Sequence, residues 1–371
     1  MHIHVVAVAG TGMGALAGLL KALGHDVSGS DVAFDPPMGP ALDAWGVRKL
    51  TGFDPKHLDP EPDLVVIGNV CRRNNPEAMA AMEGGLRYTH IAGALQEFVL
   101  SKTSPLVVAG THGKTTTSAM AAWLLDAVGR EPGFLIGGLP KNFSQSFRAP
   151  PSRTTLPAQG ALRRAPFVIE GDEYDTAFFE KTAKFLHYSA EVAIITSIEH
   201  DHIDIYPTLD SYLDAFRKFV AGIPESGLIV AAASDPLVVE VVNANARAPV
   251  AWYALEGADT HGMPPHWLAA PAEQKPEGTT FDLFAGGVAA GRFALRVPGR
   301  HNLENALGAL AACAQGYGAK LGELAHALSR FEGVRRRQDL LGEPRGVFVY
   351  DDFAHHPTAV RETLAAFRQK H

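Results

Sequence analysis

A glycine-rich turn followed by a lysine is the strongest chemical signal in this sequence. Residues 110–116 read Gly-Thr-His-Gly-Lys-Thr-Thr. In such a turn the backbone N–H groups face an anion, the next helix presents its positive end, and the lysine reaches the outer phosphates. Only two residues separate Gly110 from Gly113, so this is a shortened form of the usual phosphate loop. We predict that it binds the phosphates of ATP, the alternative being a glycine turn beside an incidental lysine.

Two acidic clusters follow two predicted strands. Residues 170–175 read Glu-Gly-Asp-Glu-Tyr-Asp after a strand at 167–170, and residues 199–204 read Glu-His-Asp-His-Ile-Asp after a strand at 192–196. The carboxyl ends of strands in an open α/β sheet are where ligands bind, and oxygen is the ligand that Mg²⁺ prefers. We predict a magnesium-ATP site. Solvated acidic loops are one alternative, and a hydrolase metal site at His200, His202 and Asp204 is another.

Three glycines near the N-terminus suggest a second nucleotide site. Gly10, Gly12 and Gly14 follow a strand at 4–9, and Asp31 comes about twenty residues later, as in a dinucleotide fingerprint. The third glycine falls one residue early and residue 15 is alanine. This spacing favours a nucleotide diphosphate other than NAD, and the alternative is a tight turn without a ligand.

The elements that would position these residues alternate between strand and helix. Strands are also predicted at residues 27–31, 63–68, 105–110, 228–231 and 347–350, with helices after each glycine turn and over 302–317, 320–331 and 357 to the end. The pattern predicts an α/β protein of three units, at 1–101, 102–297 and 298–371. Residues 148–166 are expected to form an exposed loop.

Composition narrows the class of protein. The 371 residues are 46% hydrophobic and 20% charged, with a formal net charge of −7, which gives no electrostatic support to a nucleic-acid partner. Cys71 and Cys313 are the only cysteines, so neither a disulfide framework nor a zinc site is expected. The N-terminus does not read as a signal peptide, and no apolar run approaches the length of a membrane span. We expect a cytoplasmic protein.

Five motifs together resemble those of the Mur ligases. They lie at residues 110–117, 170–175, 201–204, 299–305 and 350–357. Segments 137–143 and 175–185 resemble the family member that joins UDP-N-acetylmuramate to L-alanyl-γ-D-glutamyl-meso-diaminopimelate in peptidoglycan recycling. The resemblance implies an N-terminal Rossmann-like domain for the UDP-sugar, a central P-loop ATPase domain, and a C-terminal Rossmann-like domain. It also implies an amide-forming reaction through an acyl phosphate, with ATP as co-substrate and Mg²⁺ as cofactor.

The resemblance also assigns roles to individual residues. It implies metal ligands at Thr115, Glu170 and His202, and it gives catalytic roles to Lys114, Glu170, His202 and Arg337. The UDP-sugar site would use Gly10, Gly12, Gly14 and Asp31. The ATP site would use Gly110, Thr111, His112, Gly113, Lys114, Thr115, Thr116, Asn302 for the adenine and Asp352 for the ribose.

Three departures from the family pattern bear on these expectations. The family's C-terminal domain continues beyond the motif at Asp352, so a truncated third domain is expected here. The carbamylated lysine of some relatives has no secure match, since counting along the helix reaches Arg217 and Lys218. The loop at 148–166 looks longer and more basic than the family pattern. Separately, the run Arg335-Arg-Arg337, interpreted without the family, is better explained as a solvated basic turn.

Other functions stay open at this stage. A ligase that adds L-alanine to UDP-N-acetylmuramate shares the mechanism, and so does a folylpolyglutamate synthetase, although the latter lacks an N-terminal UDP-sugar domain. A nucleotide-binding protein without catalysis comes from a different class. A NAD-dependent oxidoreductase would leave the phosphate loop unexplained.

Overall fold

The N-terminal part of the chain forms a parallel sheet covered by helices. The computed structural model describes residues 1–151, 164–275 and 278–371. Five strands pair in the order β3-β2-β1-β4-β5, all parallel: β1 His2–Val6, β2 Asp26–Asp31, β3 Arg48–Thr51, β4 Leu64–Ile67 and β5 Tyr88–Thr89. Between them lie α1 Thr11–Ala22, α2 Met38–Ala44, α3 Pro76–Glu83 and α4 Ile91–Phe98, with 3₁₀ turns η1 Pro55–Leu58 and η2 Leu100–Lys102. The strand-turn-helix alternation predicted for this part is confirmed.

The central sheet has ten strands, in the order β17-β16-β15-β14-β13-β12-β6-β9-β7-β8. Its strands are β6 Ser104–Ala109, β7 Gly133–Leu135, β8 Phe147–Arg148, β9 Pro166–Gly171, β12 Val192–Ile195, β13 Leu228–Ala232, β14 Val250–Leu255, β15 Trp267–Lys275, β16 Gly278–Ala285 and β17 Val288–Leu295. The seven strands from β15 to β7 run parallel, and β16 and β17 continue from β15 as an antiparallel meander. The loop expected at 148–166 lies largely outside the described residues.

Helices cover both faces of the central sheet because alternate strand residues point to opposite sides. Leu106 and Val108 of β6 share a core with one set of helices: α5 Lys114–Ala127, α8 Arg300–Ala311 and α9 Leu321–Leu328. Val107 and Ala109 pack with the other set: α6 Leu209–Gly222, α7 Pro236–Asn245 and, from the N-terminal unit, α1 and α4. The helix expected at 302–317 is α8 continued by a π-helical turn, η4 Ala312–Gly316. The division of the chain at residues 101 and 297 stays a prediction.

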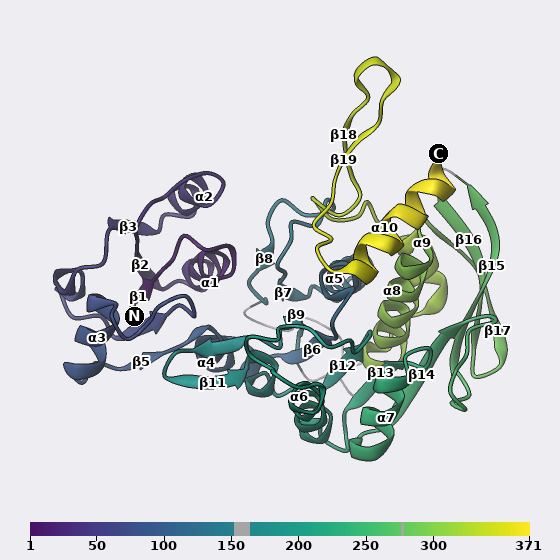
Figure 1. The fold of residues 1–371 in the computed structure, drawn as a ribbon, viewed down its shortest axis with the longest axis horizontal. Helices are drawn as coiled ribbons and strands as arrows, with labels where there is room; N and C mark the ends of the chain where they lie inside the picture. Colours follow the sequence, from purple (N-terminus) through teal and green to yellow (C-terminus); the bar gives the residue numbers. More distant parts are fainter. Residues whose placement is uncertain (152–163, 276–277) are drawn as a thin grey trace.

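Two smaller elements complete the fold. A hairpin leaves the central sheet after β9, formed by β10 Asp175–Ala177 and β11 Glu180–Ala183, and the 3₁₀ turn η3 Lys184–His187 follows it. The last part of the chain contains β18 Asp339–Gly342, the 3₁₀ turn η5 Pro344–Gly346, β19 Val349–Asp351 and α10 Pro357–Lys370. Figure 1 shows the β18–β19 hairpin (yellow) extending away from the body while α10 lies beside α8. None of the described helices is long and apolar enough to cross a membrane.

A buried polar pair joins β1 to α3 in the N-terminal unit. His4 and Glu77 are both fully buried and contact each other through Nε2 and Oε1. The remaining polar atoms of the pair also have partners, since Ser28 Oγ lies 2.8 Å from His4 Nδ1 and His57 Nδ1 lies 3.3 Å from Glu77 Oε2. The pair therefore fixes α3, and with it the loop that leads from β4 into α3.

We expect Glu77→Ala to lower the free energy of unfolding by about 3–5 kcal/mol, because it leaves His4 buried without its partner. The double variant His4→Phe/Glu77→Leu, which replaces both partners with apolar side chains, should recover most of that loss. Urea unfolding followed by circular dichroism measures both changes. A double variant as unstable as the single one would contradict this view of the pair.

Candidate active site

The phosphate loop connects β6 to α5 at the centre of the ten-stranded sheet. Its two glycines are required by backbone geometry and by space. Gly110 has φ +135°, and a Cβ there would lie 2.2 Å from Thr196 Oγ1; Gly113 has φ +81°, and a Cβ there would lie 2.4 Å from Asn305 Oδ1. Both conformations favour glycine. The close approach of Asn305 also places the start of α8 against the loop.

The ammonium of Lys114 is held at the loop by oxygen atoms. Its Nζ donates to the carbonyl oxygen of Gly110 at 2.7 Å and to both carboxylate oxygens of Glu173, at 3.0 and 3.2 Å. The side chain is 13% exposed. Burial alone would lower the pKa of Lys114, but the carboxylate of Glu173 and its acidic neighbours raise it above its usual value. The lysine is therefore a fixed positive charge at the mouth of the phosphate loop.

A hydroxyl and a carboxylate meet beside the lysine. Thr115 Oγ1 donates to Glu170 Oε2 at 2.9 Å, and the backbone N–H of Gly137 donates to Glu170 Oε1 at 2.6 Å. Burial and the nearby Asp172 raise the pKa of the Glu170 carboxyl. A hard divalent cation prefers such oxygen ligands, and its charge would offset the energetic cost of removing this carboxylate from water. Thr115 and Glu170 thus fit the cation that was predicted from the sequence.

Glu173 connects Lys114 to His202. The Nε2 atom of His202 lies 3.2 Å from Glu173 Oε1, and the hydroxyl of Tyr212 donates to the same oxygen at 3.4 Å. Burial alone would raise the pKa of Glu173, but Lys114 and the hydrogen bond from His202 lower it. Burial alone would lower the pKa of His202, but the hydrogen bond to Glu173 and the charges of Glu173 and Asp201 raise it. Glu173 was missing from the sequence-based site, although it lies within the acidic motif that was recognised.

The loop after β12 is tied to the phosphate loop by a set of short hydrogen bonds. Thr111 Oγ1 accepts from the backbone N–H of Glu199 at 2.8 Å and lies 2.9 Å from the Tyr212 hydroxyl. His112 Nε2 lies 2.8 Å from Glu199 Oε2. The tertiary structure thus brings both acidic clusters to the loop, because β9 and β12 flank β6. Tyr212 could not be found from sequence, because an aromatic residue on a buried helix face looks like core.

The C-terminal segment reaches the same loop. Thr358 at the start of α10 donates to Glu199 Oε1 at 3.0 Å, and His356 packs on His112 with ring centroids 4.8 Å apart. Atoms that could bind a metal ion lie within 4.8 Å of one another here, in the side chains of His112, Glu199 and His356. The start of α10 is thus in contact with the edge of the phosphate loop.

The residues expected around the adenosine lie on α8 and the C-terminal segment. Asn302 is buried, and its Nδ2 donates to Gln338 Oε1 at 3.3 Å, while the N–H of Gln338 donates to Asp352 Oδ2 at 2.7 Å. Gln338 thus links the two expected residues. Arg337 lies apart from them, since its guanidinium is 5.2 Å from the centroid of the Phe353 ring. In the described part of the chain, no ion pair joins Arg337 to the phosphate loop.

On α6, Arg217 and Lys218 both form ion pairs with nearby carboxylates. Arg217 forms an ion pair with Asp210 at 2.7 Å, and Lys218 forms one with Asp214 at 2.6 Å. Lys218 is 64% exposed. Both residues therefore lie on the outer face of α6, away from Lys114.

The N-terminal glycines form a tight turn at the end of β1. Gly10 is the N-terminal cap of α1, and a Cβ at Gly14 would lie 2.2 Å from Met38 Sδ. The Asp31 carboxylate closes the turn, since Asp31 Oδ2 accepts from the N–H of Ala9 at 2.8 Å. Gly12 has more room, with Ile91 Cδ1 3.8 Å from its added Cβ. The four expected residues are thus brought together at one edge of the N-terminal sheet.

A cavity lies between the N-terminal unit and the β10–β11 hairpin. Its volume is about 750 Å³. Arg72 and Arg73 line it from the β4–α3 loop, Lys181 from the hairpin, and Tyr174 and Asp204 from beside His202. The cavity therefore has three basic residues in its lining and reaches Tyr174, the neighbour of Glu173 in the chain.

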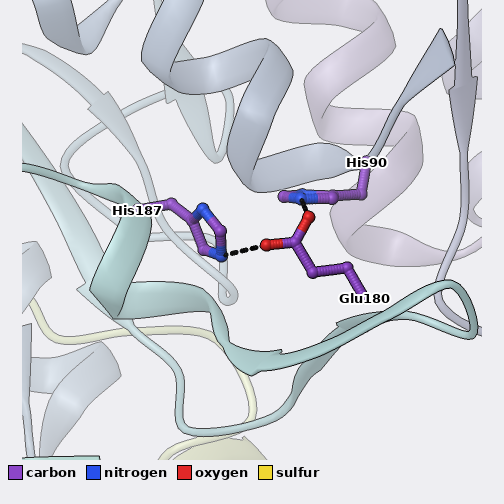
Figure 2. A group of neighbouring side chains, drawn as sticks. All are labelled: His90, Glu180 and His187. Carbon is purple, nitrogen blue, oxygen red and sulfur yellow. Dashed lines mark hydrogen bonds and ion pairs between the residues drawn. The ribbon is translucent and has the colours of Figure 1, made fainter.

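The hairpin also connects the two sheets through the three side chains of Figure 2. His90 caps the N-terminus of α4 and accepts a hydrogen bond from the N–H of Gly93 at its Nδ1, while its Nε2 lies 3.1 Å from Glu180 Oε2. His187 Nε2 lies 3.5 Å from Glu180 Oε1. Because Nδ1 accepts, the proton of neutral His90 sits on Nε2 and is donated to Glu180. A metal ion bound at Nε2 would need the proton of His90 to sit on Nδ1 instead, where Gly93 already donates. We therefore interpret this arrangement as a hydrogen-bonded contact between the two units.

The sequence is similar to that of known proteins along its whole length. Residues 2–103 match the Mur ligase family, catalytic domain, and residues 108–313 match the Mur ligase middle domain. The UDP-N-acetylmuramate--L-alanyl-γ-D-glutamyl-meso-2,6-diaminoheptandioate ligase of Escherichia coli K12 is 40% identical over 370 residues, which are 100% of this chain and 76% of that protein. A UDP-N-acetylmuramate--L-alanine ligase of Roseiflexus sp. RS-1 is 35% identical, over 100% of this chain and 76% of its own length.

A solved structure agrees with these sequence matches. The crystal structure of a murein peptide ligase from Psychrobacter arcticus 273-4 superimposes with a TM-score of 0.84 at 35% identity, covering 100% of this chain and 76% of that one. The similarity thus extends over both the N-terminal sheet and the central sheet.

Acid should weaken the contact between the hairpin and α4. Burial lowers the pKa of His90 below its usual value, although Glu180 acts in the opposite direction. The unfolded chain therefore takes up this proton at a higher pH than the folded one, and stability is lost as the pH falls below about 6.5. We expect His90→Asn, which keeps a capping side chain, to lose less stability than the wild type between pH 7.5 and pH 5.5. Urea midpoints at the two pH values measure the difference, and equal losses would show that His90 does not titrate in this way.

Proposed function

Because this chain belongs to the Mur ligase family of ATP-dependent ligases, we propose that it joins the carboxylate of UDP-N-acetylmuramate to the α-amine of L-alanyl-γ-D-glutamyl-meso-diaminopimelate. The observation that carries the proposal is the cluster around Lys114, where a phosphate loop, the partly buried Glu170, the buried Glu173 and His202 meet. The cavity at Tyr174 lies next along the chain. The relative from Escherichia coli is named for these two substrates. An amide-forming ligase of peptidoglycan recycling accounts for both observations.

The reaction would pass through an acyl phosphate. The muramate carboxylate attacks the γ-phosphorus of ATP and ADP leaves, which forms the acyl phosphate. The peptide amine then attacks the acyl carbon, and the resulting tetrahedral intermediate expels inorganic phosphate to give the amide. Negative charge gathers in both steps, so fixed positive charge and N–H groups at the phosphate loop are the main stabilising groups. Lys114 and the backbone of residues 110–116 have these roles in the proposal.

Thr115 and Glu170 would hold a magnesium ion, and His202 would serve a second one. The cation neutralises phosphate charge when it is bound. Support for this assignment comes from the Thr115–Glu170 oxygen pair at 2.9 Å and from the buried environment of the carboxylate. His202 at present contacts Glu173, so this side chain would have to exchange a partner.

The remaining predicted residues would bind the two nucleotides. For ATP, Asn302 would contact the adenine and Asp352 the ribose, which the link through Gln338 supports. Arg337 would approach the phosphates, which requires it to leave the Phe353 ring. For the UDP-sugar, the turn that contains Gly10, Gly12 and Gly14 would bind the diphosphate, with Asp31 supporting the turn. The basic cavity would then hold the muramoyl end.

Addition of L-alanine is the second candidate, because relatives of that name also align with the whole chain. The two candidates share the ATP site and the UDP-sugar site. They differ in the amine that attacks the acyl phosphate, so the acceptor decides between them.

We expect the 371-residue protein to release phosphate from ATP only when UDP-N-acetylmuramate and the tripeptide are both present. Lys114→Ala should lower that rate about 100-fold or more, because it removes a cation aimed at the developing charge. Lys218→Ala is the matched control, since this exposed lysine lies on the outer face of α6. Phosphate release is followed with a coupled assay and the product by mass spectrometry.

Three outcomes of this assay would contradict the proposal. Equal turnover with L-alanine would favour the second candidate. Binding of ATP without phosphate release, even with both substrates present, would favour a nucleotide-binding protein without catalysis. Equal rates in the Lys114 and Lys218 variants would remove Lys114 from the reaction.

A further inference from the structure

We propose that Glu173 is a positioning residue that holds Lys114 and His202 in place before ATP arrives and competes with the phosphates of ATP for Lys114. The proposal rests on the ATP site assigned above. In this proposal, Glu173 weakens the binding of ATP and raises the rate of the reaction that follows. Nothing in the phosphate-loop pattern itself requires a glutamate at this position.

Glu173 collects donors from three separate elements. Lys114 begins α5, His202 lies in the loop between β12 and α6, and Tyr212 lies on α6 itself. All three place a donor within 3.4 Å of the Glu173 carboxylate. The Glu173 side chain is only 1% exposed. A buried carboxylate of this kind needs its charged partner, so Lys114 is strongly bound in the absence of ATP.

The backbone of Glu173 is fixed, so the lysine must be the partner that moves. The Tyr206 hydroxyl donates to the carbonyl oxygen of Glu173 at 2.6 Å. Two residues later the chain enters the β10–β11 hairpin, whose Phe178 and Phe179 pack against the apolar cluster of the N-terminal sheet. Lys114, in contrast, has a long flexible side chain at the start of a helix. Incoming phosphates would therefore draw Lys114 toward the loop and away from a stationary carboxylate.

Transfer of Lys114 has a cost in binding and a benefit in geometry. The ammonium exchanges one anionic partner for another, so part of the attraction to phosphate is cancelled by the loss of Glu173. At the same time Glu173 holds His202 and Lys114 side by side, so less conformational entropy is lost in ordering these side chains when substrate binds. A carboxamide at position 173 would keep the shape and the hydrogen-bonding capacity but would remove the competing charge.

The experiment compares binding and turnover in Glu173→Gln. Binding of the non-hydrolysable analogue AMP-PNP with Mg²⁺ is measured by isothermal titration calorimetry on the 371-residue protein. We expect Glu173→Gln to bind AMP-PNP about threefold to tenfold more tightly, as expected for removal of one competing charged hydrogen bond. Under the assay conditions above, its kcat should fall about tenfold or more while its KM for ATP also falls. A purely structural role would instead raise KM or weaken binding.

Two controls separate this competition from a general effect of charge. Asp214→Asn removes the same charge on α6, where the carboxylate contacts Lys218 rather than Lys114, and it should change the affinity for AMP-PNP by less than about twofold. In a Lys114→Met background, Glu173→Gln should no longer tighten binding, because the shared partner is gone. Glu173→Asp, which keeps the charge, should bind AMP-PNP as the wild type does.

Each outcome decides the proposal. Unchanged or weaker binding by a folded Glu173→Gln protein would overturn it, and so would equal tightening in the Lys114→Met background. If Glu173→Gln does not fold, Glu173→Asp still tests the proposal, because a retained carboxylate must keep competing for Lys114. A folded Glu173→Asp protein that bound AMP-PNP more tightly than the wild type, by more than the change in Asp214→Asn, would contradict competition. Failure of the proposed ligase reaction is distinct, since the wild type would then bind AMP-PNP without releasing phosphate from ATP. A wild type that binds no AMP-PNP would overturn both.

Discussion

The position of β6 inside the central sheet is the constraint on which the candidate site depends. In the order β12-β6-β9, the strand that carries the phosphate loop has an acidic loop on each side. Parallel strands end at the same edge, so the three loops must meet there. The register of these strands, with Val107 opposite Ala193 and Ile169, places the ends of β9 and β12 level with the start of the phosphate loop.

Bringing these loops together creates an electrostatic problem that Lys114 solves. In the acidic loop after β9, burial disfavours the charged forms of Glu170 and Glu173, and Asp172 adds a like charge near Glu170. The ammonium of Lys114 offsets this because it contacts Glu173 directly, whereas Glu170 depends on Thr115 and on one backbone N–H. The pKa of Glu173 is accordingly lowered and that of Glu170 raised. The site thus contains one carboxylate in direct contact with a lysine and one whose direct partners are a hydroxyl and a backbone N–H.

The same acidic loop also connects the two sheets. From Glu173 the chain runs directly into the β10–β11 hairpin, which packs Phe179 against Tyr88 and pairs Glu180 with His90. Residues that touch the N-terminal unit and residues that touch Lys114 are therefore separated by only a short, folded segment. We expect a shift of the N-terminal sheet to move Glu173, because only a short folded segment connects this residue to the contacts with Tyr88 and His90.

Much of the architecture could be predicted from the order of residues. Apolar runs followed by glycine turns and helical patterns identified β1, β6, β9, β12 and β13, because buried parallel strands have an almost continuous apolar sequence. The meander β15–β17 was missed, since it lacks the continuous apolar run of a buried parallel strand and contains several glycines. For β19 the prediction was only approximate, because Val349–Asp351 is half exposed and pairs with a single strand.

For the site, the sequence by itself determined the local chemistry: a shortened phosphate loop at Gly110 and Gly113, with Lys114 and Thr115 beside it, and two acidic loops after strands. These depend on neighbours along the chain, so spacing alone reveals them. Only the tertiary structure decided which groups meet: that Glu173 rather than Glu170 holds Lys114, that Tyr212 and Glu199 belong to the same network, and that Gln338 links Asn302 to Asp352. Such contacts join residues far apart in the chain, and strand order and helix packing, which no local pattern encodes, bring them together.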